Sequence, residues 1–86
     1  MSPPEPSGEV AMLRLGPRIV ADAKVCFGKP VIEGTRVPVD LVLGQLAGGM
    51  AIEAVCKEYD LAREDVLAAL AYAAQTVAAK EIRSVD

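Results

Sequence analysis

The chain has 86 residues, which allows one domain with little stability to spare. Just over half of the residues are apolar (52%) and only 3% are aromatic, so the core must consist of aliphatic side chains and alanine. Histidine is missing from the sequence, which removes the usual proton shuttle and the commonest metal ligand. A formal net charge of −3 argues against strong non-specific nucleic-acid binding, which normally needs a basic excess.

The charges are unevenly distributed along the chain. Residues 12–38 contain five basic and two acidic side chains, a net charge of +3. Residues 39–86 contain four basic and eight acidic side chains, a net charge of −4. We therefore expect an anionic ligand to meet the first half of the chain and a cation-rich partner to meet the second.

A β segment is predicted over residues 9–37, after a disordered tail at residues 1–8 (M-S-P-P-E-P-S-G). Leu13 and Leu15 alternate with Arg14, as in a half-buried strand, and Gly16-Pro17 is a strong turn signal. This strand is too short to be stable alone and needs a partner strand, from its own chain or from a second copy.

The stretch from Gly28 to Val39 (G-K-P-V-I-E-G-T-R-V-P-V) is dense in residues that set backbone direction. Val31-Ile32 and Arg36-Val37 are expected to be extended, with a tight turn at Glu33-Gly34 between them. Pro38 suits the first turn of a helix, where its missing N–H costs nothing.

A three-helix unit is predicted over residues 38–82, forming a single domain with the β segment (residues 9–86). The first helix runs to about residue 47 and ends at Gly48-Gly49; its buried side chains should be Leu41, Val42 and Leu46. The second covers about residues 51–59, with an apolar stripe of Ile52, Val55, Cys56 and Tyr59. The third runs from about 63 to 81, with a buried side of Val66, Leu67, Leu70, Ala74 and Val77. The short break at residues 60–62 gives the last two helices helix-turn-helix spacing.

Catalysis is not expected. Glu64-Asp65 stand in the first turn of a helix, where adjacent carboxylates usually complement the helix dipole. Cys26 and Cys56 are interpreted as reduced, buried thiols of a cytoplasmic protein, and the glycines do not fit a phosphate-binding loop. No apolar run reaches the roughly 18 residues that a membrane-spanning helix needs. We predict no enzymatic activity, cofactor, metal, small-molecule substrate or membrane partner.

The sequence offers two alternative surfaces for binding DNA. The start of the third helix offers Arg63, but the two acids beside it would repel phosphate. The β segment offers a basic edge that a dimer would double. The candidate nucleic-acid contacts are Arg14, Arg18, Lys29, Arg36 and Arg63. For Arg36 a structural role is favoured, as a clamp on carbonyl oxygens or on a carboxylate such as Asp40.

Three segments carry a family resemblance: G-K-P-V-I-E-G-T-R-V-P-V at 28–39, L-x-x-L-A-G-G-M at 43–50 and E-D-V-L-A-A-L-A-Y-A-A at 64–74. The chain resembles the domain-of-unknown-function family numbered 433 over about residues 18–79. The resemblance implies a VapB-like antitoxin with a homeodomain-like, trihelical helix-turn-helix fold, mostly α with a small N-terminal β segment. It further implies a neighbouring PIN-like ribonuclease toxin as partner and repression of the shared operon. The family motif falls on residues interpreted mainly as architecture: Gly28, Lys29, Pro30, Gly34, Thr35, Arg36 and Pro38.

Two positions depart from the family pattern. Ala51 and Ala62 stand where the family tends to place Ser or Thr as helix N-caps. Asp60 and Asp65 are expected to compensate in part. Three hypotheses stay open: an antitoxin-like homodimer that neutralises a toxin and represses its operator DNA, a stand-alone dimeric helix-turn-helix regulator, and a purely structural dimerisation module.

Overall fold

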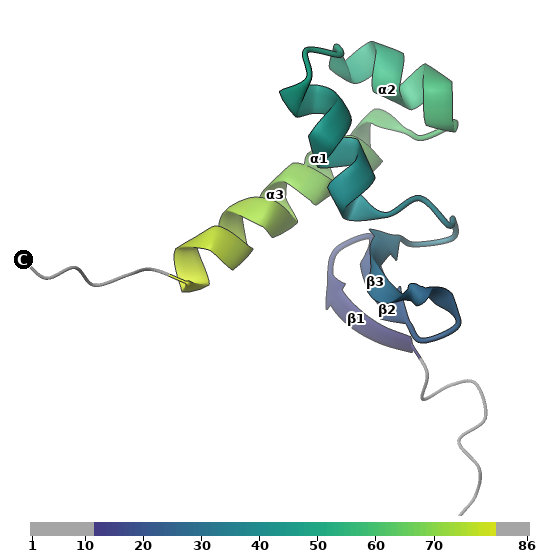
Figure 1. The fold of residues 1–86 in the computed structure, drawn as a ribbon, viewed down its shortest axis with the longest axis vertical. Helices are drawn as coiled ribbons and strands as arrows, with labels where there is room; N and C mark the ends of the chain where they lie inside the picture. Colours follow the sequence, from purple (N-terminus) through teal and green to yellow (C-terminus); the bar gives the residue numbers. More distant parts are fainter. Residues whose placement is uncertain (1–11, 81–86) are drawn as a thin grey trace, which may run out of the picture.

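The computed structural model describes residues 12–80, so the tail expected at residues 1–8 lies outside the described residues. Three strands, β1 (Met12–Gly16), β2 (Ile19–Asp22) and β3 (Val25–Ile32), precede three helices, α1 (Val39–Ala47), α2 (Ile52–Tyr59) and α3 (Arg63–Ala79) (Figure 1). The strands form one antiparallel sheet in the order β1-β2-β3. The described chain is therefore a small N-terminal sheet followed by three helices, as the sequence predicts.

The turn expected at Gly16-Pro17 joins β1 to β2. Gly16 pairs with Ile19, which leaves Pro17 and Arg18 as the loop, and Arg18 adopts a positive φ of 66°. The partner strand that β1 needs is thus supplied by its own chain.

Strand β3 begins earlier than the sequence indicates. Asp22 pairs with Val25 and Ala21 pairs with Pro30, so the four residues 26–29 bulge out of the pairing. Cys26, Phe27 and Gly28 all have positive φ (51°, 57° and 86°), and this left-handed run allows the bulge. Two of these three residues are not glycine, which is why the sequence did not reveal the feature.

The tight turn expected at Glu33-Gly34 is present, and Gly34 has a φ of +83°. The Ile32 N–H donates to the Val37 carbonyl at 3.0 Å. The Thr35 hydroxyl donates to the Ile32 carbonyl at 2.8 Å and accepts from the Val37 N–H at 2.9 Å. Arg36 and Val37 do not form a strand, and a single bridge between Val31 and Pro38 closes the loop instead.

The core lies between the sheet and the helices. One face of the sheet contributes Ile19 and Ile32, and the full buried cluster is Ile19, Ile32, Val39, Val42, Val55, Leu61, Val66 and Ala69. In α1 the buried residues are Val39 and Val42, while Leu41 and Leu46 are only half-buried. The stripe expected on α2 is confirmed, with Val55 buried and Ile52, Cys56 and Tyr59 packed partly buried against the core.

The buried side expected for α3 is wrong except at Val66. The helix buries Val66 and Ala69, with Ala68 and Tyr72 partly buried beside them. Leu67, Leu70, Ala74 and Val77 are exposed instead. The helix is apolar on nearly every side, so the hydrophobic pattern did not decide which face meets the core.

The observed N-caps of α2 and α3 agree in part with the caps expected from the sequence. Ala51 and Ala62 are the N-caps of α2 and α3 and provide no side-chain hydrogen bond. The Asp65 carboxylate accepts the Ala62 N–H at 2.9 Å, which confirms one half of a capping box. Asp60 does not cap α3; it ends α2 in the left-handed conformation. Within residues 12–80, none of the helices combines the length and the apolar character needed to cross a membrane.

Candidate functional site

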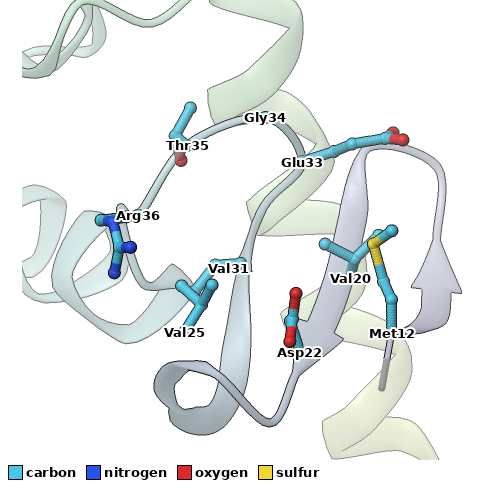
Figure 2. Close-up of a pocket in the computed structure, with 9 residues that line it drawn as sticks. All are labelled: Met12, Val20, Asp22, Val25, Val31, Glu33, Gly34, Thr35 and Arg36. Atoms are coloured by element: carbon cyan, nitrogen blue, oxygen red, sulfur yellow. The ribbon is translucent and has the colours of Figure 1, made fainter. Parts of the chain in front are cut away.

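The face of the sheet turned away from the helical core forms an open groove of about 730 Å³ (Figure 2). Successive strand residues point to opposite faces, so Val20 and Val31 lie on this side while Ile19 and Ile32 enter the core. Val20 and Val31 are paired across the sheet and are themselves buried. With Met12 and Val25 they give the groove an apolar floor.

The family-motif loop forms one side of this groove. Val31, Glu33, Gly34, Thr35 and Arg36 all line it, and all fall within the segment 28–39. The two hydrogen bonds of the Thr35 hydroxyl and the left-handed Gly34 fix the loop against the end of β3. Of the residues interpreted mainly as architecture, Gly34, Thr35 and Arg36 therefore also shape a surface depression.

Arg36 provides a cation at the groove, and Figure 2 places its guanidinium beside Val25 and Val31. Its side chain makes no ion pair with any residue of the described range 12–80, and it is exposed. The clamp expected between Arg36 and Asp40 is wrong, because Asp40 pairs with Lys29 at 2.8 Å. The backbone carbonyl of Arg36 accepts a long contact of 3.5 Å from the Cys26 thiol.

Two carboxylates lie at the same groove. The Asp22 carboxylate accepts the Lys24 N–H at 2.9 Å within the β2–β3 connection. Glu33 pairs with Arg14 at 2.7 Å, and this hydrogen bond holds the pKa of Glu33 below its ordinary value and raises that of Arg14. The groove thus combines an apolar floor, the two carboxylates and Arg36, which has no acid beside it in the described range.

The other four candidate nucleic-acid contacts are each paired with an acid. Arg14 pairs with Glu33 at 2.7 Å and Arg18 with Asp65 at 2.9 Å. Lys29 pairs with Asp40 at 2.8 Å, and the longer Arg63–Glu53 pair measures 3.4 Å. The structure therefore distributes these cations over separate ion pairs between elements. A phosphate would have to compete with a carboxylate at each of them.

Some groove residues were missed in the sequence. Met12, Val20, Asp22 and Val25 were not singled out, yet they line the groove together with the motif. The signal lay in the neighbouring apolar pairs Ile19-Val20 and Val31-Ile32, which put large apolar side chains on both faces of the sheet. Glu64 and both thiols lie outside the groove, and Asp65 serves in an ion pair and a cap.

The groove's chemistry suits a docked segment of chain. Its floor can bury one or two apolar side chains, and the Arg36 guanidinium can donate up to five hydrogen bonds to a carboxylate or to carbonyl oxygens. Across residues 12–80, no three His, Cys, Asp or Glu side chains are grouped so that they could hold a metal ion.

Comparison with known proteins gives three findings. The sequence model of a family described as "Protein of unknown function (DUF433)" matches residues 19–73. An uncharacterized protein of Archaeoglobus fulgidus is 70% identical over 23 residues, which is 27% of this chain and 64% of that protein. The crystal structure of Rv2018 from Mycobacterium tuberculosis is similar at a TM-score of 0.63 and 34% identity. The match covers 70% of this chain and 30% of that one, so the chain spans less than a third of the length of Rv2018.

Proposed function

This chain belongs to the DUF433 family, and we propose that it is a non-catalytic, cytoplasmic, VapB-like antitoxin that binds and neutralises a PIN-like ribonuclease toxin. The observation that carries the proposal is the groove on the free face of the sheet, which the family motif builds around Arg36. A segment of the toxin would insert apolar side chains between Val20, Val25 and Val31. An acidic group or chain carbonyl of that segment would meet Arg36.

The charge of the helical half supports a ribonuclease as partner. Glu53, Glu58, Asp60 and Glu64 are exposed on α2 and at the start of α3. A ribonuclease must present cations to bind the phosphates of RNA, and a surface of exposed carboxylates is complementary to such a cleft. Groove and acidic surface would then act together, the first giving specificity and the second a faster association.

The proposal includes operator binding by a homeodomain-like helix-turn-helix formed by α2, residues 60–62 and α3. The short connection between the helices favours this assignment. Ion pairing of Arg18 and Arg63 weighs against strong phosphate contact. A salt titration of the protein with its own promoter DNA tests this part separately. Absence of binding at about 50 mM salt, where electrostatic attraction is ample, would leave only the toxin-binding role.

Neutralisation is tested by mixing the chain with the protein encoded beside it and measuring RNA cleavage. The wild-type chain should suppress cleavage in a stable complex. Met12→Arg and Arg36→Glu, both at exposed groove positions, should weaken the complex at least tenfold. Lys80→Glu, a charge reversal at the exposed end of α3, away from both the groove and the acidic surface, is the matched control and should bind normally. Undiminished cleavage in the mixture would overturn the proposal. Equal binding by all variants would mean that the toxin does not bind at the groove.

A further inference from the structure

We propose that Phe27 is an anchor residue of the toxin interface, where its ring inserts into an apolar pocket of the toxin. This inference rests on the proposed toxin binding and names the side chain that dominates it. Phe27 stands in the bulge at residues 26–29 and is 99% exposed. Phenylalanine is among the residues most often buried, because its large ring is strongly stabilised by leaving water. A single exposed apolar residue is nevertheless common on protein surfaces, so the argument needs the backbone as well.

The backbone that presents Phe27 is unfavourable for this type of residue. Cys26 and Phe27 have φ values of +51° and +57°, and Gly28 follows at +86°. In the left-handed region the Cβ atom approaches a carbonyl oxygen, so a bulky residue there is strained, whereas glycine adopts it freely. The exposed ring has almost no contact with its own chain that could offset this strain. Strained residues of this kind cluster at binding sites, and we assign the ring to a contact outside the chain.

Contacts on both sides of Phe27 hold the bulge in one place. The Cys26 thiol makes the long contact of 3.5 Å to the Arg36 carbonyl, in the motif loop. The Lys29 ammonium pairs with Asp40 at 2.8 Å, in the first turn of α1. The ring is therefore presented from a loop connected to the rest of the fold at each end. A preorganised loop loses less conformational entropy when it binds.

The bulge adjoins the groove. Asp22 and Val25, which pair at its base, both line the groove, and so does Arg36, whose carbonyl contacts Cys26. Phe27 does not line the groove, so it extends the interface beyond it. Aromatic residues and arginine are enriched in protein–protein interfaces, and here one of each lies on neighbouring loops. A toxin segment in the groove would bring the toxin surface up to the Phe27 ring.

The charges around the bulge favour a protein as the partner of the ring. Asp22 and Asp40 balance Lys24 and Lys29, so this part of the chain has two acids and two bases. Stacking of nucleic-acid bases on an aromatic ring is normally combined with a positively charged groove along the backbone. Docking to an anionic membrane likewise uses clustered cations. A protein pocket needs no excess of charge, so the feature complementary to Phe27 is an apolar pocket that accepts a phenyl ring.

Substitutions at position 27 test the inference by titration against the protein encoded beside this chain, with Kd and RNA cleavage as readouts. Phe27→Ala and Phe27→Gly should each weaken the complex by about 30-fold or more, as loss of a dominant interface residue does. Phe27→Leu keeps an apolar side chain and should weaken it less. Val77→Ala is the matched control, because Val77 is also exposed (71%) and apolar but lies on α3 outside the groove, and it should bind normally.

Thermal unfolding of the free chain separates binding from a structural role. Phe27→Gly should have a higher Tm than Phe27→Ala, because only glycine relieves the left-handed strain. Both should fold with wild-type circular dichroism, since the ring is exposed. A side chain with only a structural role would not lose toxin binding in the variant that is the more stable of the two.

The outcomes distinguish this inference from the proposed function. If the wild type silences the toxin and Phe27→Ala binds it equally well, toxin binding stands and the anchor role is overturned. If the wild type does not bind the toxin, both fall. Titration with a single-stranded RNA and with vesicles of anionic phospholipid tests the class of partner, and the wild type should bind neither. Binding to either one that Phe27→Ala abolishes would overturn the assignment to a protein pocket.

Discussion

The Arg18 guanidinium donates to the Asp65 carboxylate at 2.9 Å, and the other oxygen of that carboxylate accepts the Ala62 N–H at 2.9 Å. One side chain thus ties the β1–β2 loop to the first turn of α3. The Asp65 side chain is 17% exposed, so its bonds are better shielded from water than those of the other surface pairs.

Asp65→Ala should lower the free energy of unfolding by about 1–2 kcal/mol, because it removes two charge-assisted hydrogen bonds. Arg18→Gln should cost less, about 0.5 kcal/mol, since the capping bond to Ala62 is kept. Urea denaturation of both variants and of the double variant completes a mutant cycle. Strictly additive costs would mean that the two side chains do not interact in solution.

Restoring the missing caps should stabilise the chain. Ala51 and Ala62 already have the extended backbone of an N-cap, with φ, ψ of −72°, 155° and −84°, 159°. Ala62→Ser can complete the capping box with Asp65, and Ala51→Ser can cap α2. Each should raise the free energy of unfolding by about 1 kcal/mol. Ala71→Ser, in the interior of α3 and exposed, is the control and should be slightly destabilising. Equal effects at all three positions would contradict the capping explanation.

The residues that form turns and helix ends made much of the fold predictable from the sequence. The turn at Gly16-Pro17, the turn at Gly34 and the starts of the helices follow from local chemistry that a few residues determine. The sequence could not predict which face of α3 meets the core. The helix is apolar on both faces, and only packing against the rest of the fold decides between them.

The candidate site was harder to predict because its parts are distant in the sequence. Arg18 and Asp65 are 47 residues apart and Arg14 and Glu33 are 19 apart, so their pairing depends on the tertiary fold. In the sequence, the five candidate nucleic-acid contacts predicted a positive edge. The fold places an acid beside four of them and leaves Arg36 without one in the described part of the chain.

Two glycine-to-alanine substitutions should have opposite effects. Gly34 has a φ of +83° with open space around a built Cβ, so Gly34→Ala should cost about 1–2 kcal/mol through backbone strain alone. Gly44 lies inside α1, exposed and also with open space, so Gly44→Ala should gain about 0.5–1 kcal/mol. Thermal unfolding followed by circular dichroism measures both. A stabilising Gly34→Ala would mean that the motif turn has another conformation.

The Lys29–Asp40 pair connects β3 to the first turn of α1 and should make stability depend on pH in a defined way. The hydrogen bond with Lys29 holds the pKa of Asp40 below its ordinary value, and the same bond raises the pKa of Lys29. Its stabilisation is therefore fully present between the unfolded-state values of about 3.9 and 10.4. It is lost as the pH falls through the lowered pKa of Asp40 or rises through the raised pKa of Lys29. Carbon-detected NMR titration of Asp40 should show its pKa moving up in Lys29→Met and staying in place in Lys57→Met. An unchanged titration in Lys29→Met would mean that water keeps the two side chains apart in solution.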